Sequence, residues 1–298
     1  MIRSLGVLAT ALVGGGEPCA RTRIAGIDAL VAEPRAACGP VAVFANAATR
    51  HGIDEPAVAR FLGGLAGAGF VAVAPELPSV RRGEVTPDTV EALVRVIDAT
   101  GRRVALIGAS TGAGLALLAA SDPRIAGYVC SVAAIAPFAS LRAIVKLGTT
   151  GHYGDRPFEA APLVGVAAAR SLTASAPDDP AVAPVLANRD PARFDELYAA
   201  LAPETRALVE NLSPVSRIGR VTAPVELASS PADPFFPVEE TIALAEAGSD
   251  VRVTVTPALV HVKPCLRPGL VRIVALFDRT LARAAEVDPV AQLRPSVA

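Results

Sequence analysis

Short runs of consecutive apolar residues alternate along most of the chain with segments in which apolar residues recur every three or four positions. The runs are typical of strands buried on both faces of a parallel sheet, and the longer segments are typical of helices packed against it. The expected strands cover residues 24–34, 41–45, 70–74, 104–107, 125–135, 225–229 and 251–256. The expected helices cover residues 55–67, 87–100, 113–120, 238–247 and 271–285. This alternation predicts an α/β fold with a doubly wound, mostly parallel sheet.

One long segment interrupts the alternation. About ninety residues separate the strand that ends near Ala136 from the strand that begins near Pro224, far more than an ordinary connection contains. Helical patterns occur in this segment at 141–146, 161–172, 191–201 and 204–212. We interpret it as a helical cap inserted into the sheet domain, where it would cover a site and shape a pocket. A peripheral structural insertion is the alternative.

The N-terminus is a separate apolar segment. Arg3 precedes an apolar stretch and Gly14-Gly15-Gly16, which is the outline of a short signal peptide; a docked N-terminal helix fits the same residues. The stretch is too short to span a bilayer, and we expect no stable membrane span. We expect a cytoplasmic protein, with export as the alternative. The predicted divisions are 1–20 for this segment, 21–138 with 216–288 for the core, 139–215 for the cap and 289–298 for a C-terminal tail.

The composition limits the kind of hydrophobic core and the kinds of partner and metal site that this protein can have. Hydrophobic residues make up 52% of the chain, aromatic residues only 4%, and Trp is absent, so the core must be aliphatic. The 28 basic and 29 acidic residues are scattered, which gives no electrostatic footprint for nucleic acid. The four cysteines show no C-x-x-C spacing, which argues against a zinc site. We expect free, mostly buried thiols, with a Cys19–Cys38 bridge as the alternative.

The most specific chemical signal is the pentapeptide Gly108-Ala109-Ser110-Thr111-Gly112, which lies between a predicted strand and a predicted helix. A G-x-S-x-G sequence in this context predicts a nucleophile elbow, because small residues on either side of the serine let the strand and the helix pass closely. The turn would lift the Ser110 hydroxyl above the sheet. It would also point the first helical N–H groups, beginning with Thr111, toward a developing oxyanion.

A serine nucleophile requires a base, and the base requires an orienting acid. Of the three histidines, His261 follows the last strand of the sheet, and functional residues of parallel sheets gather at such carboxyl ends. Asp233 stands in the loop after the preceding strand and is the acid expected from this geometry. The alternatives are a histidine that caps a helix and an aspartate that forms a turn.

The chain order serine, aspartate, histidine is the order of the α/β-hydrolase superfamily, and the chain resembles that superfamily from Val41 to the helix after His261. The resemblance implies that a second oxyanion donor follows the third strand, where Asn46, Ala47 and Ala48 stand in place of the usual His-Gly motif. The backbone N–H of Ala47 or Ala48 would be this donor.

The resemblance implies hydrolysis of a carboxylic ester or thioester of a small, largely apolar molecule through an acyl-enzyme on Ser110, with no metal and no organic cofactor. Asn46, together with His152 and Tyr153 of the cap, is a candidate for substrate binding. Two alternatives stay open. One is a lyase or cyclase of the same fold acting on a biosynthetic intermediate, and the other is a ligand-binding protein without catalysis.

Overall fold

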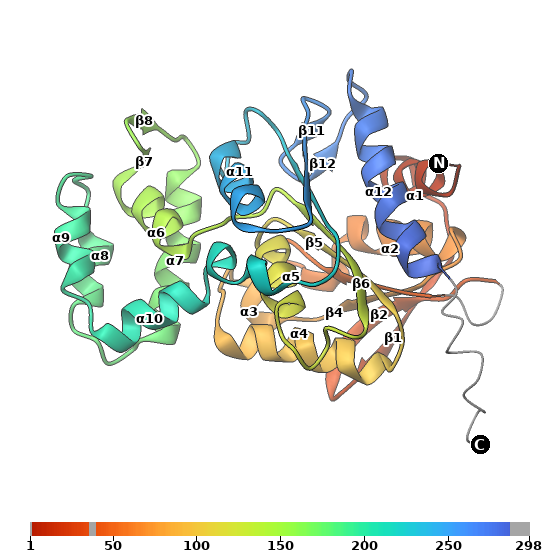
Figure 1. Ribbon diagram of the computed structural model, residues 1–298, viewed down its shortest axis with the longest axis horizontal. Helices are drawn as coiled ribbons and strands as arrows, with labels where there is room; N and C mark the ends of the chain where they lie inside the picture. The colour runs from red at the N-terminus through yellow and green to blue at the C-terminus, as the bar shows by residue number, and fades with distance from the viewer. Residues whose placement is uncertain (1, 36–39, 287–298) are drawn as a thin grey trace.

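An eight-stranded sheet forms the centre of the computed structural model, which describes residues 2–35 and 40–286 (Figure 1). The strand order is β1-β2-β4-β3-β5-β6-β9-β10, in which β2 is antiparallel to both neighbours and the pairs from β4 to β10 are parallel. The strands are β1 (Cys19–Ile24), β2 (Ile27–Ala32), β3 (Val41–Ala45), β4 (Val71–Pro75), β5 (Val104–Ala109), β6 (Val129–Ile135), β9 (Val225–Ser229) and β10 (Val251–Val255). The predicted fold class, a mostly parallel α/β sheet, is confirmed.

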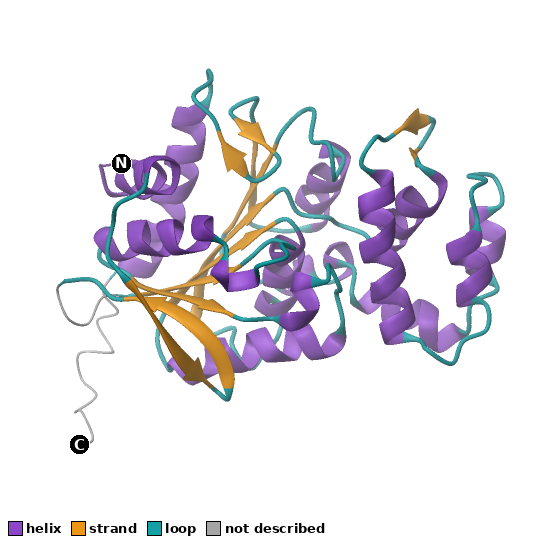
Figure 2. Cartoon of the chain, turned by 180° about the vertical axis from the view of Figure 1, so that it is seen from behind, coloured by secondary structure: helices purple, strands orange, loops and turns teal. Residues whose placement is uncertain are grey.

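Helices cover both faces of this sheet (Figure 2). One face carries α1 (Ile2–Val13), α2 (Pro56–Gly67) and α12 (Leu270–Ala285), and the other carries α4 (Pro87–Thr100), α5 (Thr111–Ala120) and α11 (Val238–Ala247). Side chains of β3 alternate between the two layers: Val41 and Val43 face α4 and α5, whereas Ala42 and Phe44 face α1, α2 and α12. The continuous apolar runs of the sequence are therefore strands buried on both faces.

The single strand expected at 24–34 is instead a hairpin of β1 and β2. Ala25 and Gly26 form its two-residue turn with φ of 51° and 79°, which is the backbone required by a tight hairpin turn. The hydrophobic pattern does not reveal β1, because β1 is an edge strand whose residues Ala20 through Arg23 are exposed.

The N-terminal segment forms the helix α1, which packs against α2 and α12. Val7 and Leu8 of α1 are buried, and the hydroxyl of Ser4 donates a hydrogen bond to Asp278 of α12. Residues 2–13 thus adopt the docked helix that the sequence offered as one alternative. No helix in the described part of the chain combines the length and apolarity that crossing a bilayer requires.

The long interruption in the sequence is a group of helices at one side of the sheet (Figures 1 and 2). It contains α6 (Leu141–Thr150), α7 (Ala161–Ser175), α8 (Val182–Ala187), α9 (Phe194–Ala199), α10 (Pro203–Asn211) and a small hairpin of β7 (His152–Tyr153) and β8 (Arg156–Pro157). α6 and α7 pack so closely that a Cβ on Gly148 would overlap the backbone of Gly165. The hairpin was not expected, and neither was α8, which lies between the helical patterns expected at 161–172 and 191–201.

The remaining short elements connect these layers. They are α3 (Pro78–Arg81), β11 (Leu259–Val260), β12 (Lys263–Pro264) and 3₁₀ turns at Gly52–Asp54, Pro214–Ser216 and Ile218–Arg220. The predicted cap boundaries, 139–215, enclose α6 to α10 and stay a prediction, as does the division from the core. The tail predicted at 289–298 lies outside the described residues.

The cysteines of the described chain are half-buried rather than mostly buried, and the thiols of Cys19 and Cys265 are free. Cys38, the second partner of the alternative bridge, lies outside the described residues.

A buried carboxylate joins the helical group to the core. Glu240 of α11 is 2% exposed and accepts hydrogen bonds from the backbone N–H of Ala139 and Ser140, at 2.7 and 2.9 Å, and from the Tyr153 hydroxyl at 2.8 Å. Ser140 is also the N-cap of α6, because its hydroxyl accepts from the N–H of Ala143. Glu240 therefore fixes both the entry to the helical group and its β7–β8 hairpin.

Replacing Glu240 by glutamine should change how stability depends on pH. Burial raises the pKa of this carboxyl above its ordinary 4.5, so the folded state holds the proton more tightly than the unfolded state. The wild type should therefore lose stability relative to Glu240→Gln as the pH rises above 4.5 and through the raised pKa. Unfolding midpoints across a pH series measure the difference.

The control for this series is Glu246→Gln, which alters an exposed carboxylate of the same helix and should show no such trend. Glu240→Ala should instead be destabilised by about 1–3 kcal/mol, because two buried N–H groups lose their acceptor. A midpoint difference between Glu240→Gln and the wild type that stays constant across the series would contradict the expectation.

Candidate active site

Ser110 occupies a strained turn between β5 and α5. Its φ of 53° and ψ of −121° lie in a region that non-glycine residues rarely adopt. A Cβ on Gly112 would overlap the carbonyl oxygens of Ala45 and Asn46 at the end of β3, and a Cβ on Gly108 would lie 2.5 Å from the Gly112 carbonyl oxygen. Glycine at both positions is what allows strand and helix to approach around the serine.

A continuous hydrogen-bonded chain runs from Ser110 through His261 to Asp233. His261 Nε2 lies 2.8 Å from Ser110 Oγ, and His261 Nδ1 lies 2.9 and 3.0 Å from the two carboxylate oxygens of Asp233. Ser110 follows β5, Asp233 follows β9, and His261 follows β11. The fold thus brings together three side chains that the sequence singled out, although 151 positions separate the serine from the histidine.

The carboxylate of Asp233 is completely buried, and its surroundings hold it in place. Oδ1 also accepts hydrogen bonds from the N–H groups of Phe235 and Phe236, at 2.9 and 3.0 Å. The same two phenylalanine rings pack against the imidazole of His261, with ring centroids 4.6 and 5.9 Å away. The carboxylate is thereby kept out of contact with solvent, which strengthens its electrostatic interaction with His261.

Phe235 and Phe236 were missed by sequence reasoning. The available signal was their position, because two adjacent aromatic residues, separated from the expected acid only by Pro234, are unusual in a chain with 4% aromatic residues.

The loop after β3 presents two backbone N–H groups with different surroundings. The side-chain oxygen of Asn46 accepts from the N–H of Ala47 at 2.8 Å, and its amide nitrogen donates to the carbonyl of Gly52 at 2.9 Å. Ala48 is exposed, and within residues 2–35 and 40–286 its N–H meets no hydrogen-bond acceptor. Asn46 therefore occupies the Ala47 N–H and leaves that of Ala48 open.

Thr111 is the first residue of α5, so its N–H belongs to the helix end that lacks intrahelical acceptors. The positive end of the helix dipole lies at the same place and favours negative charge there.

The other predicted substrate contacts have partners within the fold. Nδ1 of His152 lies 2.9 Å from the carbonyl oxygen of Thr150, and the hydroxyl of Tyr153 donates to Glu240. Burial and the neighbouring Glu240 carboxylate raise the pKa of Tyr153, so its hydroxyl stays a donor. His152 and Tyr153 both belong to β7, and each is hydrogen-bonded to a residue outside the β7–β8 hairpin. Their contact with substrate stays a prediction.

Helix α7 reaches the edge of this site. The N–H of Val85 donates to the hydroxyl of Ser171, and Arg170 donates to the carbonyl oxygen of Arg82. A Cβ on Gly83 would lie 2.8 Å from the Cβ of Ala167 and 3.9 Å from that of Ala48. The helical group therefore packs beside the loop that carries the open N–H.

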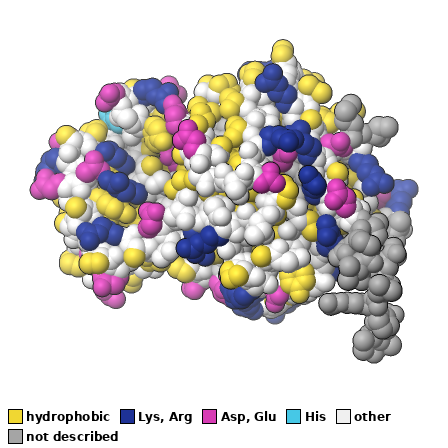
Figure 3. All heavy atoms as spheres, in the orientation of Figure 1, with side chains coloured by type: hydrophobic (Ala, Val, Ile, Leu, Met, Phe, Trp, Pro, Cys, Tyr) yellow, Lys and Arg dark blue, Asp and Glu magenta, His cyan; other side chains and the backbone are white. Residues whose placement is uncertain are grey.

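The face of the molecule in Figure 3 shows no patch of a single charge among the described residues. On the face in Figure 3, basic and acidic side chains are interspersed, in keeping with the scattered charges of the sequence. A groove of about 750 Å³ lies between the β1–β2 hairpin, α3, α4 and the end of α7, and its lining contains none of Ser110, Asp233 and His261.

Comparison with known proteins agrees with this geometry. A model of the alpha/beta hydrolase family matches residues 21–293. Est1E from Butyrivibrio proteoclasticus is similar in structure, with 13% identity, a TM-score of 0.58 and coverage of 90% of this chain and 100% of that chain. An acylaminoacyl peptidase from Pyrococcus horikoshii has 14% identity and a TM-score of 0.59, with coverage of 93% of this chain and 43% of that chain.

A third similar structure is a membrane phospholipase A, described as a bacterial virulence factor, with 17% identity, a TM-score of 0.56 and coverage of 96% of this chain and 91% of that chain. A search of curated proteins finds no match. At these identities the structural similarities establish the fold, and the chemistry has to be argued from the site.

Proposed function

Because the chain belongs to the alpha/beta hydrolase family, we propose that it is a serine hydrolase that cleaves a carboxylic ester or thioester of a small, largely apolar molecule. The observation that carries this proposal is the hydrogen-bonded chain from Ser110 to Asp233 through His261. Its geometry is that of a nucleophile, a base and an orienting acid, which is recognised by roles rather than by sequence position.

In the proposed reaction, Ser110 Oγ attacks the carbonyl carbon of the substrate while His261 Nε2 takes its proton. The tetrahedral intermediate collapses, the imidazolium gives the proton to the leaving alcohol or thiol, and an acyl-enzyme remains on Ser110. Water then attacks the acyl-enzyme with the same histidine as base, and the acid is released.

Asp233 has two parts in this scheme. Its contact with Nδ1 keeps the proton of the neutral imidazole on that nitrogen, which leaves Nε2 free to accept from the serine. Its negative charge, buried beside Phe235 and Phe236, stabilises the imidazolium when it forms.

The oxyanion would be held by the N–H groups of Thr111 and Ala48. In the described part of the chain neither N–H donates to an acceptor, whereas the N–H of Ala47 donates to the side-chain oxygen of Asn46. The proposal therefore selects Ala48 from the two residues that the sequence left open, and it assigns Asn46 to the loop rather than to the substrate.

The proposed substrate class follows from the surroundings of the site. The rings of Phe235 and Phe236 pack against the imidazole of His261, and Ala167 of α7 lies near Gly83, which in turn lies near Ala48. These groups favour an apolar acyl or alcohol part over a charged one. The helical group would act as a cap that shapes this pocket.

Labelling with a fluorophosphonate probe, combined with a substrate panel, tests the proposal. We expect one equivalent of probe on Ser110 and a higher kcat/KM for short to medium alkyl and aryl esters than for peptides. Thioesters belong in the panel because the proposal includes them. Peptides and a phospholipid belong in it because an acylaminoacyl peptidase and a phospholipase A are among the similar structures. Ser110→Ala is the unlabelled control.

Preferential cleavage of peptides would overturn the proposed substrate class. Labelling of Ser110 without hydrolysis of any acyl substrate would instead favour a lyase or cyclase that uses the same residues.

A further inference from the structure

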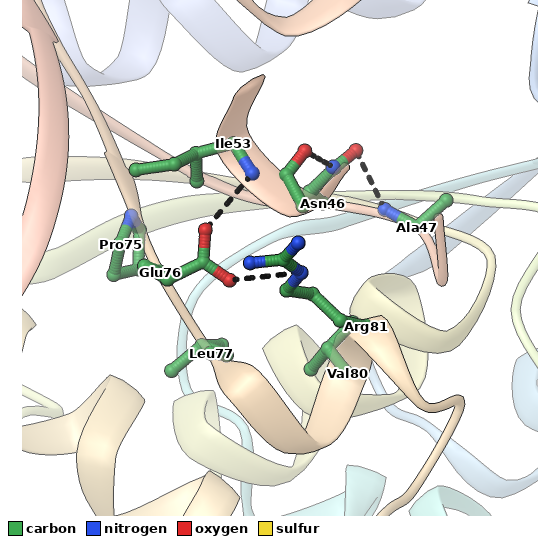
Figure 4. Close-up of a pocket in the computed structure, with 9 residues that line it drawn as sticks. Asn46, Ala47, Ile53, Pro75, Glu76, Leu77, Val80 and Arg81 are labelled. Atoms are coloured by element: carbon green, nitrogen blue, oxygen red, sulfur yellow. Dashed lines mark hydrogen bonds and ion pairs between the residues drawn. The ribbon is translucent and has the colours of Figure 1, made fainter. Parts of the chain in front are cut away.

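The loop from Asn46 to Asp54 is held by polar contacts to the segment that follows β4 (Figure 4). The N–H of Ile53 donates to Glu76 Oε2 at 3.1 Å. The guanidinium of Arg81 donates to the carbonyl oxygen of Arg50 at 2.9 and 3.3 Å, and its Nε lies 4.0 Å from Glu76 Oε1. Glu76 and Arg81, two charged side chains outside the loop, therefore bind its backbone at Ile53 and at Arg50.

Glu76 is an unusual group for this position. Its side chain is 15% exposed, and among the described residues its buried Oε1 makes no hydrogen bond and has only the Arg81 ion pair. Burial of a carboxylate oxygen without a full set of partners costs free energy. The carboxylate is thus held against the loop at a cost to stability.

The contact between Glu76 and the loop is direct. Gly52 has a φ of 56°, and a Cβ on it would lie 2.6 Å from Glu76 Oε1 and 2.7 Å from Oε2. The carboxylate therefore packs on the loop backbone itself, at a glycine whose left-handed conformation is strained for most other residues.

Glu76 lines a pocket that also contains Asn46 and Ala47, and this pocket is too small for a substrate. Its volume of about 10 Å³ leaves room for at most a single water molecule. Glu76 also lines the groove of about 750 Å³ beside the β1–β2 hairpin, whose lining contains none of Ser110, Asp233 and His261, so the contact that connects Glu76 with the site is the one with the loop.

We infer that Glu76, supported by Arg81, is a positioning residue for the proposed hydrolysis. It fixes the loop in the conformation in which Asn46 occupies the Ala47 N–H and the Ala48 N–H faces the substrate carbonyl. The inference rests on the proposed function. It goes beyond that function because it states that the Glu76 carboxylate, 28 positions later in the chain, holds the Ala48 N–H in place.

The expected effect is on turnover rather than on binding. An oxyanion donor acts mainly in the transition state, so displacement of the Ala48 N–H lowers kcat and leaves KM nearly unchanged. Complete loss of one such donor lowers kcat by about 10²- to 10³-fold. For Glu76→Ala, which loosens the loop but keeps the donor, we expect a loss of kcat of roughly 10- to 100-fold.

The experiment compares Glu76→Ala, Glu76→Gln and Glu84→Ala on the ester that the wild type hydrolyses best. Glu84 is the matched control, because it is also a carboxylate paired with an arginine, Arg82, and its side chain is 11% exposed. Glu76→Gln should fall between Glu76→Ala and the wild type, because its amide oxygen still accepts from Ile53 while the ion pair with Arg81 is lost. Glu84→Ala should keep kcat within about 2-fold.

A second readout separates positioning from a loss of folding. The affinity for a boronic acid transition-state analogue should fall by the same factor as kcat, while the unfolding midpoint of Glu76→Gln stays near that of the wild type. If Glu76→Ala does not fold, Glu76→Gln and Arg81→Lys carry the test.

Wild-type kcat in Glu76→Gln and Glu76→Ala, or an equal loss in Glu84→Ala, would overturn the inference. Its failure is distinguishable from failure of the proposed function: a wild type that neither reacts with fluorophosphonate nor hydrolyses any ester contradicts the function, whereas a reactive wild type with unaffected Glu76 variants contradicts the positioning alone.

Discussion

Ser110→Ala is expected to lower kcat/KM for the preferred ester by about 10⁴- to 10⁶-fold, because the variant keeps the oxyanion donors and loses the hydroxyl that would form the acyl-enzyme. The serine hydroxyl lies 2.8 Å from His261 Nε2, and among the described residues no other hydroxyl is hydrogen-bonded to this histidine. Steady-state kinetics and probe labelling of the purified variant measure the loss.

The fold of the Ser110→Ala variant should be intact. Alanine fits the space of serine, and the positive φ of 53° costs both residues similar strain, so the unfolding midpoint should stay close to that of the wild type. Ser121→Ala is the matched control: Ser121 is also buried, its hydroxyl donates to Leu118 at the end of the same helix, and its loss should leave kcat/KM nearly unchanged. An active Ser110→Ala protein would refute the proposed nucleophile.

Asp233→Asn is expected to lower kcat/KM by about 10⁴-fold. The new amide would donate a hydrogen bond to His261 Nδ1 and so move the proton of the neutral imidazole to Nε2. A protonated Nε2 cannot accept from Ser110, and the imidazolium would lose the buried negative charge that stabilises it. The rate of fluorophosphonate labelling should fall in parallel, because that step also requires the base.

This variant separates a catalytic part for Asp233 from a purely structural one. The amide oxygen of asparagine can still accept from the N–H groups of Phe235 and Phe236, so the turn should survive. Asp179→Asn provides the control, because Asp179 likewise accepts from backbone N–H groups, those of Ala181 and Ala202, away from the three site residues. A loss below about 10-fold in Asp233→Asn would identify Asp233 as a turn former.

Much of the fold could be predicted because its signals are local. The limits of α4 follow from Thr86, whose hydroxyl accepts from Thr89 at the start of the helix, and from Gly101, whose φ of 56° ends it. The buried runs of β3 and β5 needed no tertiary information. β1 was missed because an exposed edge strand carries no hydrophobic pattern, and α8 was missed because its six residues are too few for a helical period to emerge.

Some residues of the candidate site could likewise be predicted from local sequence, and others could not. Ser110 is marked by the glycines on either side of it, and Asp233 and His261 by their places after strands whose carboxyl ends meet at one edge of the sheet. The contacts of Phe235, Tyr153 and Glu76 could not be predicted, since each joins positions distant in the chain or depends on a side-chain rotamer.

The sequence by itself determined the order of strands and helices and the three candidate reacting side chains, because hydrophobic period, glycine placement and chain order are properties of short segments. Only the tertiary structure decided which backbone N–H stays open. The side chain of Asn46 accepts from the N–H of Ala47, and Glu76, in the segment after β4, accepts from Ile53 of the same loop. Among the described residues the N–H of Ala48 has no acceptor. That outcome depends on competition among hydrogen-bond partners in space, which no linear pattern contains.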